Sequence, residues 1–283
     1  MFQNLLLPLL LAAQVMTGPD KKLSSVPLAV PEGYSLVWSD EFDGTPLPNE
    51  RKWAYDTEFN RRGWHNNELQ YYSDARPKNA RIEGGSLVIE AHQERLSREA
   101  GHSDWGGQDY TSARLITRGR GQWTYGYFEI RAKVPCATGT WPAIWLLPVD
   151  NGGDWEEGGE IDIMEHVGHE LNRVHQSFHT AKLNFRLKTH PTVTSVVPRA
   201  CSDFHVYQLN WTPDRLEFGI DGILTSSHQR TSNDRRDWPF NKPFYLLLNV
   251  AVGGNWGGAE GIDAKALPDR MEVDYVRVYQ NRR

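Results

Sequence analysis

The sequence has no long stretch with a 3.6-residue apolar repeat, so we expect helices to be nearly absent. It also has no polybasic run, and its formal net charge is −5, which argues against nucleic acid or an anionic membrane as the partner. Beyond the N-terminal segment, no apolar run is long enough to span a bilayer. A neutral polymer suits this composition better than a charged partner does.

Cysteine is scarce, because the 283 residues contain only Cys136 and Cys201. Neither has the neighbours of a metal site or of a nucleophilic thiol. Two cysteines can pair in an oxidising compartment. A disulfide between them is therefore a hypothesis that rests only on their number and on the compartment.

The N-terminus carries a short apolar run from Leu5 to Ala13. This run is too short for a membrane span and has the length of a signal-peptide core. We expect a signal peptide over residues 1–18, a polar linker over 19–33 and one folded domain over 34–283, with secretion or export to the periplasm. Residues 1–4 contain no Lys or Arg, so a wrongly assigned start codon or an uncleaved segment is the alternative.

Short stretches of alternating apolar and polar residues, separated by Gly, Pro and Asn, follow from Tyr34 onward. Residues 79–92 have the pattern of a hairpin around Gly84 and Gly85, and residues 204–222 that of two strands joined by a turn. With a 39% hydrophobic content, a chain of this length can bury a full core. These patterns predict an all-β sandwich or jelly roll.

The stretch over residues 159–168 concentrates acids between isoleucines, a pattern typical of a half-buried strand with one acidic face. Glu160 and Asp162 share that face, but Glu165 is five residues after Glu160 and would point into the core of a regular strand. A buried, unpaired carboxylate is costly. We therefore predict a β-bulge near Met164 that returns Glu165 to the acidic face.

With this bulge the Cα atoms of Glu160 and Glu165 lie roughly 13 Å apart, at about 3.3 Å per residue. Side chains that lean together would bring the two carboxyls to about 5–6 Å, near the separation of about 5–5.5 Å in retaining glycosidases and below the roughly 6.5–9.5 Å of inverting ones. The spacing favours a covalent, retaining mechanism. From these residues alone, a solvated edge strand or a cation site of three carboxylates is the alternative.

The motif Gly-Glu-Ile-Asp-Ile-Met-Glu at residues 159–165 resembles the signature of glycoside hydrolase family 16, in the bulged form of its laminarinase-like members, the endo-β-1,3-glucanases. The resemblance extends from about Tyr34 to Tyr279, with its blocks in the family's order. It implies a concanavalin A-like jelly roll with a concave substrate cleft, and a catalytic domain over 34–283. No cofactor for catalysis is implied.

By the same resemblance Glu160 is the nucleophile, Glu165 the general acid/base and Asp162 the residue that assists the nucleophile. The physics agrees, because like charges raise each other's pKa and three neighbouring acids cannot all ionise easily. One of them should hold a proton near neutral pH. The general acid needs that proton, while the nucleophile must be ionised.

Eleven tryptophans are more than a core of this size usually requires, and a sugar cleft needs exposed Trp beside its acids. Trp141 and Trp145 lie four residues apart just before the acidic stretch, and we expect both to bind substrate, with packing in the core as the alternative. The resemblance places His179 near the acids, where it would hydrogen-bond the substrate or the acid/base. A buried histidine with a structural partner is the alternative.

Two further residues are expected to bind substrate from loops. Asn67 lies in a block, residues 64–72, that is close to the laminarinase pattern, although an Asx-turn cap is the alternative. Trp256 lies in a Gly-rich loop and would line a subsite, with packing in the core or a role as loop anchor as the alternatives. The basic, polar segment 183–197 departs from the better-known laminarinase loops and leaves the substrate open.

The resemblance also implies a structural Ca²⁺ on the convex side. Its ligands would come from the Glu41 region, the backbone of Gly85 and Asp274.

Together these observations predict a secreted, monomeric, retaining endo-β-glucanase that cuts β-1,3 bonds in laminarin-type or mixed-linkage glucan. One alternative is the same machinery acting on another polysaccharide, such as an algal galactan, or in transglycosylation. The other is a non-catalytic lectin of the same fold. Three crowded acids argue against the lectin, because binding alone does not need them.

Overall fold

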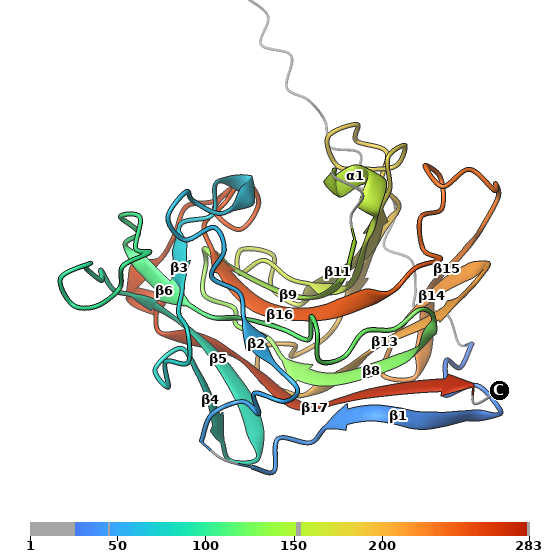
Figure 1. Ribbon diagram of the computed structural model, residues 1–283, viewed down its shortest axis with the longest axis horizontal. Helices are drawn as coiled ribbons and strands as arrows, with labels where there is room; N and C mark the ends of the chain where they lie inside the picture. The colour runs from blue at the N-terminus through green and yellow to red at the C-terminus, as the bar shows by residue number, and fades with distance from the viewer. Residues whose placement is uncertain (1–25, 45, 151–153, 282–283) are drawn as a thin grey trace, which may run out of the picture.

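The computed structural model describes residues 26–44, 46–150 and 154–281, so the predicted signal peptide lies outside the described residues. In these ranges, 17 strands form two stacked sheets with little helix (Figure 1). The predicted β-sandwich is confirmed. No helix in the described ranges combines the length and the apolarity needed to cross a membrane.

The larger sheet has ten strands: β1 (Tyr34–Asp40), β3 (Gln70–Tyr72), β4 (Ala80–Glu83), β5 (Ser86–Gln93), β6 (Tyr110–Ser112), β8 (Gly126–Lys133), β13 (His205–Thr212), β14 (Arg215–Ile220), β15 (Ile223–Gln229) and β17 (Asp269–Asn281). Their order across the sheet is β15-β14-β13-β8-β17-β5-β6-β3, with β1 beside β17 and β4 beside β5. The predicted hairpin around Gly84 and Gly85 is the β4–β5 pair.

The smaller sheet has seven strands: β2 (Ala54–Tyr55), β7 (Arg114–Ile116), β9 (Thr140–Pro148), β10 (Glu160–Glu165), β11 (Arg173–His179), β12 (Thr192–Val196) and β16 (Phe244–Val252). Their order is β12-β11-β10-β9-β16-β7-β2, so the acidic strand β10 lies inside the sheet and not at its edge. The short helices are α1 (Trp155–Gly158), η1 (His65–Asn67) and η2 (Ala264–Ala266).

The core lies between the two sheets and consists of the alternate apolar side chains of both. From β10 it takes Ile161, Ile163 and Met164, all fully buried. These three side chains fix the orientation of the strand. The carboxylates of β10 therefore face away from the ten-stranded sheet, on the side where α1 and η1 rise in Figure 1.

The end of the segment assigned to the linker packs against the larger sheet. Pro27 forms a bridge with Ile223, and the backbone N–H of Leu28 donates to the carbonyl of Gly222 at 2.7 Å. The Leu28 side chain is buried against the sheet. Packing therefore begins before the first strand, because this apolar side chain finds a site next to the β14–β15 turn.

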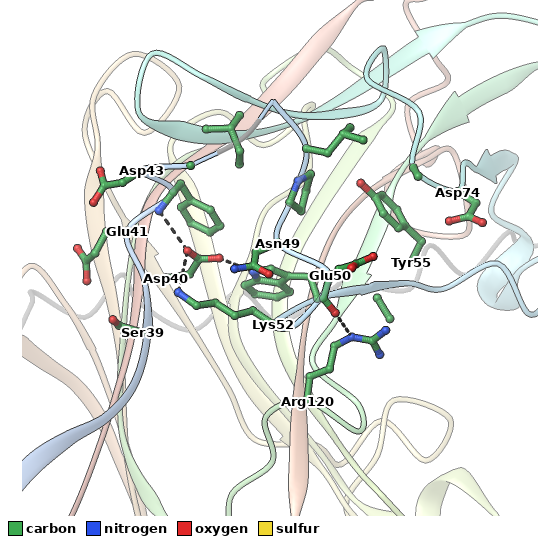
Figure 2. A pocket seen from close by; sticks show the side chains of 18 residues that line it. Ser39, Asp40, Glu41, Asp43, Asn49, Glu50, Lys52, Tyr55, Asp74 and Arg120 are labelled. Carbon is green, nitrogen blue, oxygen red and sulfur yellow. Dashed lines mark hydrogen bonds and ion pairs between the residues drawn. The ribbon is translucent and has the colours of Figure 1, made fainter.

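A pocket of about 920 Å³ lies beside the connection between β1 and β2 (Figure 2). Its buried Asp40 accepts hydrogen bonds from Lys52 Nζ at 3.1 Å and from Trp53 Nε1 at 2.8 Å. These contacts tie the connection to β1. No residue of β10 lines this pocket, so it is separate from the acidic strand.

Cys136 and Cys201 form a disulfide, which confirms the pairing hypothesis. Cys136 follows β8 and Cys201 precedes β13, and these two strands are neighbours in the larger sheet. Asp269 Oδ2 also accepts from the backbone N–H of Cys136 at 2.8 Å and of Ala137 at 2.7 Å. The β8 end is thus fixed to both β13 and β17.

Removal of the disulfide should destabilise the fold. The bond closes a loop with a sequence separation of 65 residues, and a cross-link of this kind contributes about 2–4 kcal/mol, mainly by restricting the unfolded chain. We expect the free energy of unfolding of the double variant Cys136→Ser/Cys201→Ser to be lower by that amount, as measured by urea denaturation. Thiol titration of the denatured, unreduced wild type should find no free thiol, and two free thiols there would contradict the pairing.

Candidate active site

The acidic strand β10 contains the predicted bulge. Opposite β11, Asp162 pairs with Ser177 and Glu165 with His175, so two residues on β10 face one on β11. The register with β9 shifts in the same place, between Asp162 and Met164. The bulge prediction is confirmed, and it places Glu160, Asp162 and Glu165 on one face of the sheet while Ile163 and Met164 both stay in the core.

Glu160 lies at the start of β10 beside a tryptophan from the preceding helix. The indole Nε1–H of Trp155 donates to Glu160 Oε2 at 2.7 Å, and His179 Nε2 lies 3.9 Å from Oε1. Burial and the neighbouring Asp162 raise the pKa of Glu160 to about 8, while the charge of His179 and the indole hydrogen bond oppose this rise.

Glu165 lies at the other end of the row. The indole Nε1–H of Trp141 donates to its Oε1 at 3.1 Å. Burial, followed by the charge of Asp162, raises the pKa of Glu165 well above its ordinary value, although the charge of His179 opposes the rise here too. Since Glu160 has the closer cation and the shorter indole hydrogen bond, we expect Glu160 to lose its proton first and Glu165 to keep its proton to higher pH.

Asp162 connects the row to strand β11. It is 2% exposed, accepts from the Ser177 hydroxyl at 2.8 Å and lies 3.3 Å from His179 Nε2. Burial alone would lower the pKa of His179, but the hydrogen bond and charge of Asp162 raise it to about 9. The site therefore contains an imidazolium between Asp162 and Glu160 at neutral pH.

Glu160, Asp162 and His179 are also close enough to hold a metal ion, since one ligand atom from each lies within 4.8 Å of the others. The three-carboxylate cation site considered from the sequence is different, because Glu165 is not in this group. A protonated His179 has no lone pair to offer a metal. When His179 is protonated, this group therefore offers a metal ion only its two carboxyls.

Trp141 and Trp145 are both partly exposed, and neither belongs to the buried core. Trp145 Nε1–H donates to Asn249 Oδ1 at 2.7 Å, and the guanidinium of Arg114 lies 4.7 Å from its ring centroid. Trp145 pairs with Asp162 across the β9–β10 ladder. Both rings thus lie on the acidic face, as the substrate-binding prediction requires.

Trp256 and Asn67 lie at the Glu165 end of the row. The Trp256 ring contacts Trp141 at a centroid distance of 5.5 Å and His175 at 4.7 Å. Exposed Asn67 does not reach the acids; its amide Nδ2 donates to Asn255 Oδ1 at 2.7 Å. Asn67 therefore joins the η1 segment to the loop that carries Trp256.

No sequence pattern assigned a role to Trp155, Ser177 or Arg114, which also lie at the site. Trp155 is five residues before Glu160, and only the intervening helical turn of α1 brings its indole back to that carboxylate. No spacing rule predicts such a return. For Ser177 a signal was present, because it alternates with His175 and His179 on one face of β11.

Comparison with known proteins gives a consistent result. Residues 63–277 match the model for "Glycosyl hydrolases family 16". A "Beta-glucanase" from Rhodothermus marinus is 48% identical over 258 residues, covering 87% of this chain and 85% of the relative. The family resemblance seen in the sequence is confirmed.

Two solved structures agree with this match. SCLam, a non-specific endo-β-1,3(4)-glucanase, superposes with a TM-score of 0.87 at 46% identity, covering 93% of this chain and 97% of its own. The laminarinase from Rhodothermus marinus gives a TM-score of 0.80 at 47% identity, with 87% and 97% covered. By sequence and by structure, this chain belongs to glycosyl hydrolase family 16.

Proposed function

We propose that this protein is an endo-β-glucanase that hydrolyses β-1,3-glucosidic bonds of laminarin-type or mixed-linkage glucans with retention of configuration. The observation that carries the proposal is the bulged strand β10, with Glu160 and Glu165 on one face and a distinct indole donor on each. The β-glucanase and laminarinase names of the relatives support the substrate class.

In the first step Glu160 attacks the anomeric carbon, and Glu165 protonates the glycosidic oxygen as the bond to the leaving sugar breaks. The result is a covalent glycosyl–enzyme ester on Glu160. In the second step Glu165, now ionised, takes a proton from water while the water oxygen attacks the same carbon, which releases Glu160. The imidazolium of His179 stabilises the negative charge that Glu160 carries whenever it is not bonded to the sugar.

Another polysaccharide is the nearer alternative, since the loops set the substrate and the acidic strand does not. One relative, 32% identical over 262 residues, is named as a keratan-sulfate endo-1,4-β-galactosidase. A non-catalytic lectin of the same fold is the more distant alternative. The raised pKa values of Glu160 and Glu165 oppose it, because simple sugar binding needs no proton held at neutral pH.

We also propose that the protein is exported and acts as a monomer. The apolar run from Leu5 to Ala13 supports export, and so does the disulfide, because disulfides persist in oxidising compartments. Size-exclusion chromatography with light scattering tests the monomer.

Replacement of either acid should abolish hydrolysis. We expect Glu160→Gln and Glu165→Gln each to lower kcat on laminarin by about 10²–10⁴-fold or more, because each removes a group that bonds to the reacting atoms. The measurement is reducing-sugar release from laminarin, mixed-linkage β-glucan and agarose.

The matched control is Glu217→Gln on β14, in the other sheet, which should retain wild-type activity. Activity on agarose alone would show that the substrate is a galactan and not a β-glucan. Laminarin binding by the wild type with no reducing ends released on any polymer would support the lectin.

Neutralisation of His179 should shift the pH profile. Glu160 must be ionised to attack, so activity falls as the pH drops below its pKa. The positive charge of His179 lowers that pKa, and its loss in His179→Gln should raise the pKa and move the acidic limb of kcat/KM to higher pH by roughly one unit. His92→Gln on β5 should leave the limb in place. A uniform loss of rate in His179→Gln without a shift would contradict this role.

Calcium binding stays a proposal, supported by the family resemblance. The side chain of Glu41 is engaged, because Arg277 donates to both of its oxygens at 3.0 and 2.8 Å and holds the pKa of that carboxyl below its ordinary value. Arg131 donates to Asp274 Oδ2 at 2.6 Å. Figure 2 shows Glu41 pointing away from Asp40. The ligands we propose are thus Asp274 Oδ1 and the backbone carbonyls of Glu41 and Gly85, with water completing the six to eight oxygens.

Chelation tests this site. A ligand that binds only the folded chain stabilises it, so calcium should raise the melting temperature and EDTA should lower it. Elemental analysis of the untreated protein should find about one calcium per chain. An unchanged melting temperature together with no bound metal would remove the calcium proposal.

A further inference from the structure

The connection between β11 and β12, residues 180–191, is fixed by internal hydrogen bonds. Buried Asn184 donates from Nδ2 to the carbonyls of Thr180 at 3.1 Å and Ala181 at 3.3 Å, and its Oδ1 accepts from the backbone N–H of Leu187 at 3.0 Å. Lys182 Nζ holds the base of the loop at 2.9 Å from an oxygen of Asp234 and at 2.9 Å from one of Asp237. The residue that follows Asn184 is therefore presented from a preformed turn.

That residue is Phe185, which is 41% exposed. Its ring contacts Trp155 at a centroid distance of 5.4 Å and His179 at 6.0 Å. Both of these neighbours contact Glu160. An exposed aromatic ring thus lies one side chain away from the proposed nucleophile and against Trp155 of α1.

The ring of Trp155 is half-buried, with three side chains packed against it. His179 lies against it at 5.4 Å, Phe185 at 5.4 Å and the guanidinium of Arg186 at 5.4 Å. Arg186 is itself held by an ion pair with Glu156 of α1. Arg186 also lies 5.8 Å from the centroid of Phe185. Phe185 is still the more exposed of the two aromatic rings at this end of the acidic row.

We propose that Phe185 forms a further sugar-binding subsite and stacks on the apolar face of a pyranose ring next to the ring that Glu160 attacks. The inference rests on the proposed function, because the ligand is a neighbouring unit of the same β-glucan chain. Pyranose faces are apolar and pack on aromatic rings. The turn is already held by Asn184 and the ring already packs on Trp155, so binding restricts Phe185 little and the contact adds affinity at low entropic cost.

The subsite should govern binding of long substrates and leave the chemical step unchanged. We expect Phe185→Ala to raise KM for laminarin roughly three- to tenfold with kcat nearly unchanged. This is the pattern expected when the lost contact binds the substrate and the transition state equally well. The increase should be larger for laminarihexaose than for laminaritriose, because only the longer chain reaches past the acids. Phe185→Tyr should restore the wild-type KM, whereas Phe185→Leu should not, since it keeps apolar bulk without a ring.

The control is Leu187→Ala in the same loop, because Leu187 is 57% exposed and has no ring that could stack on a sugar. It should behave as the wild type. Equal KM values for Phe185→Ala and Leu187→Ala would overturn the subsite, as would a loss in Phe185→Ala that is the same for every chain length and accompanies a lower melting temperature. A wild type inactive on every β-glucan would instead overturn the proposed function.

Discussion

The bulge in β10 is the constraint on which the site depends. The strand must bury Ile161, Ile163 and Met164 in the sandwich and still present Glu165 beside Glu160. A regular strand cannot do both, because its side chains alternate strictly between faces. One extra residue resolves the conflict, and the buried apolar side chains then hold the carboxylates at a fixed spacing.

Crowding on this face also decides where the protons are. Burial raises the pKa of both glutamates, and Asp162, which lies between them, raises it further. The contacts that oppose this rise are unequal. Glu160 has the imidazolium of His179 and a 2.7 Å indole donor, and Glu165 has an indole donor at 3.1 Å. The asymmetry produces one nucleophile and one acid from two chemically identical side chains.

The side chains around the acids come from connections that lie at very different distances from β10 in the sequence. Trp155 belongs to a helical turn just before β10, Phe185 to the loop after β11, and Trp256 to a loop near the end of the chain. The sheets hold the acidic row constant, whereas these connections shape the surface on either side of it. Substrate choice among related glycosidases is therefore expected to follow the connections and not the strand.

The sequence by itself determined the sandwich, the bulge and the three acids, because these depend on period-2 alternation and on the cost of a buried carboxylate, and both are local. The tertiary structure alone decided that Trp155 and not another tryptophan contacts Glu160, that Asn67 contacts Asn255 and not the acids, and that Leu28 packs on the larger sheet. It also gave Glu41 and Asp274 arginine partners that no motif indicates. Such contacts join residues distant in the chain, and their formation depends on how the sheets twist and the loops return, which no short pattern of residues encodes.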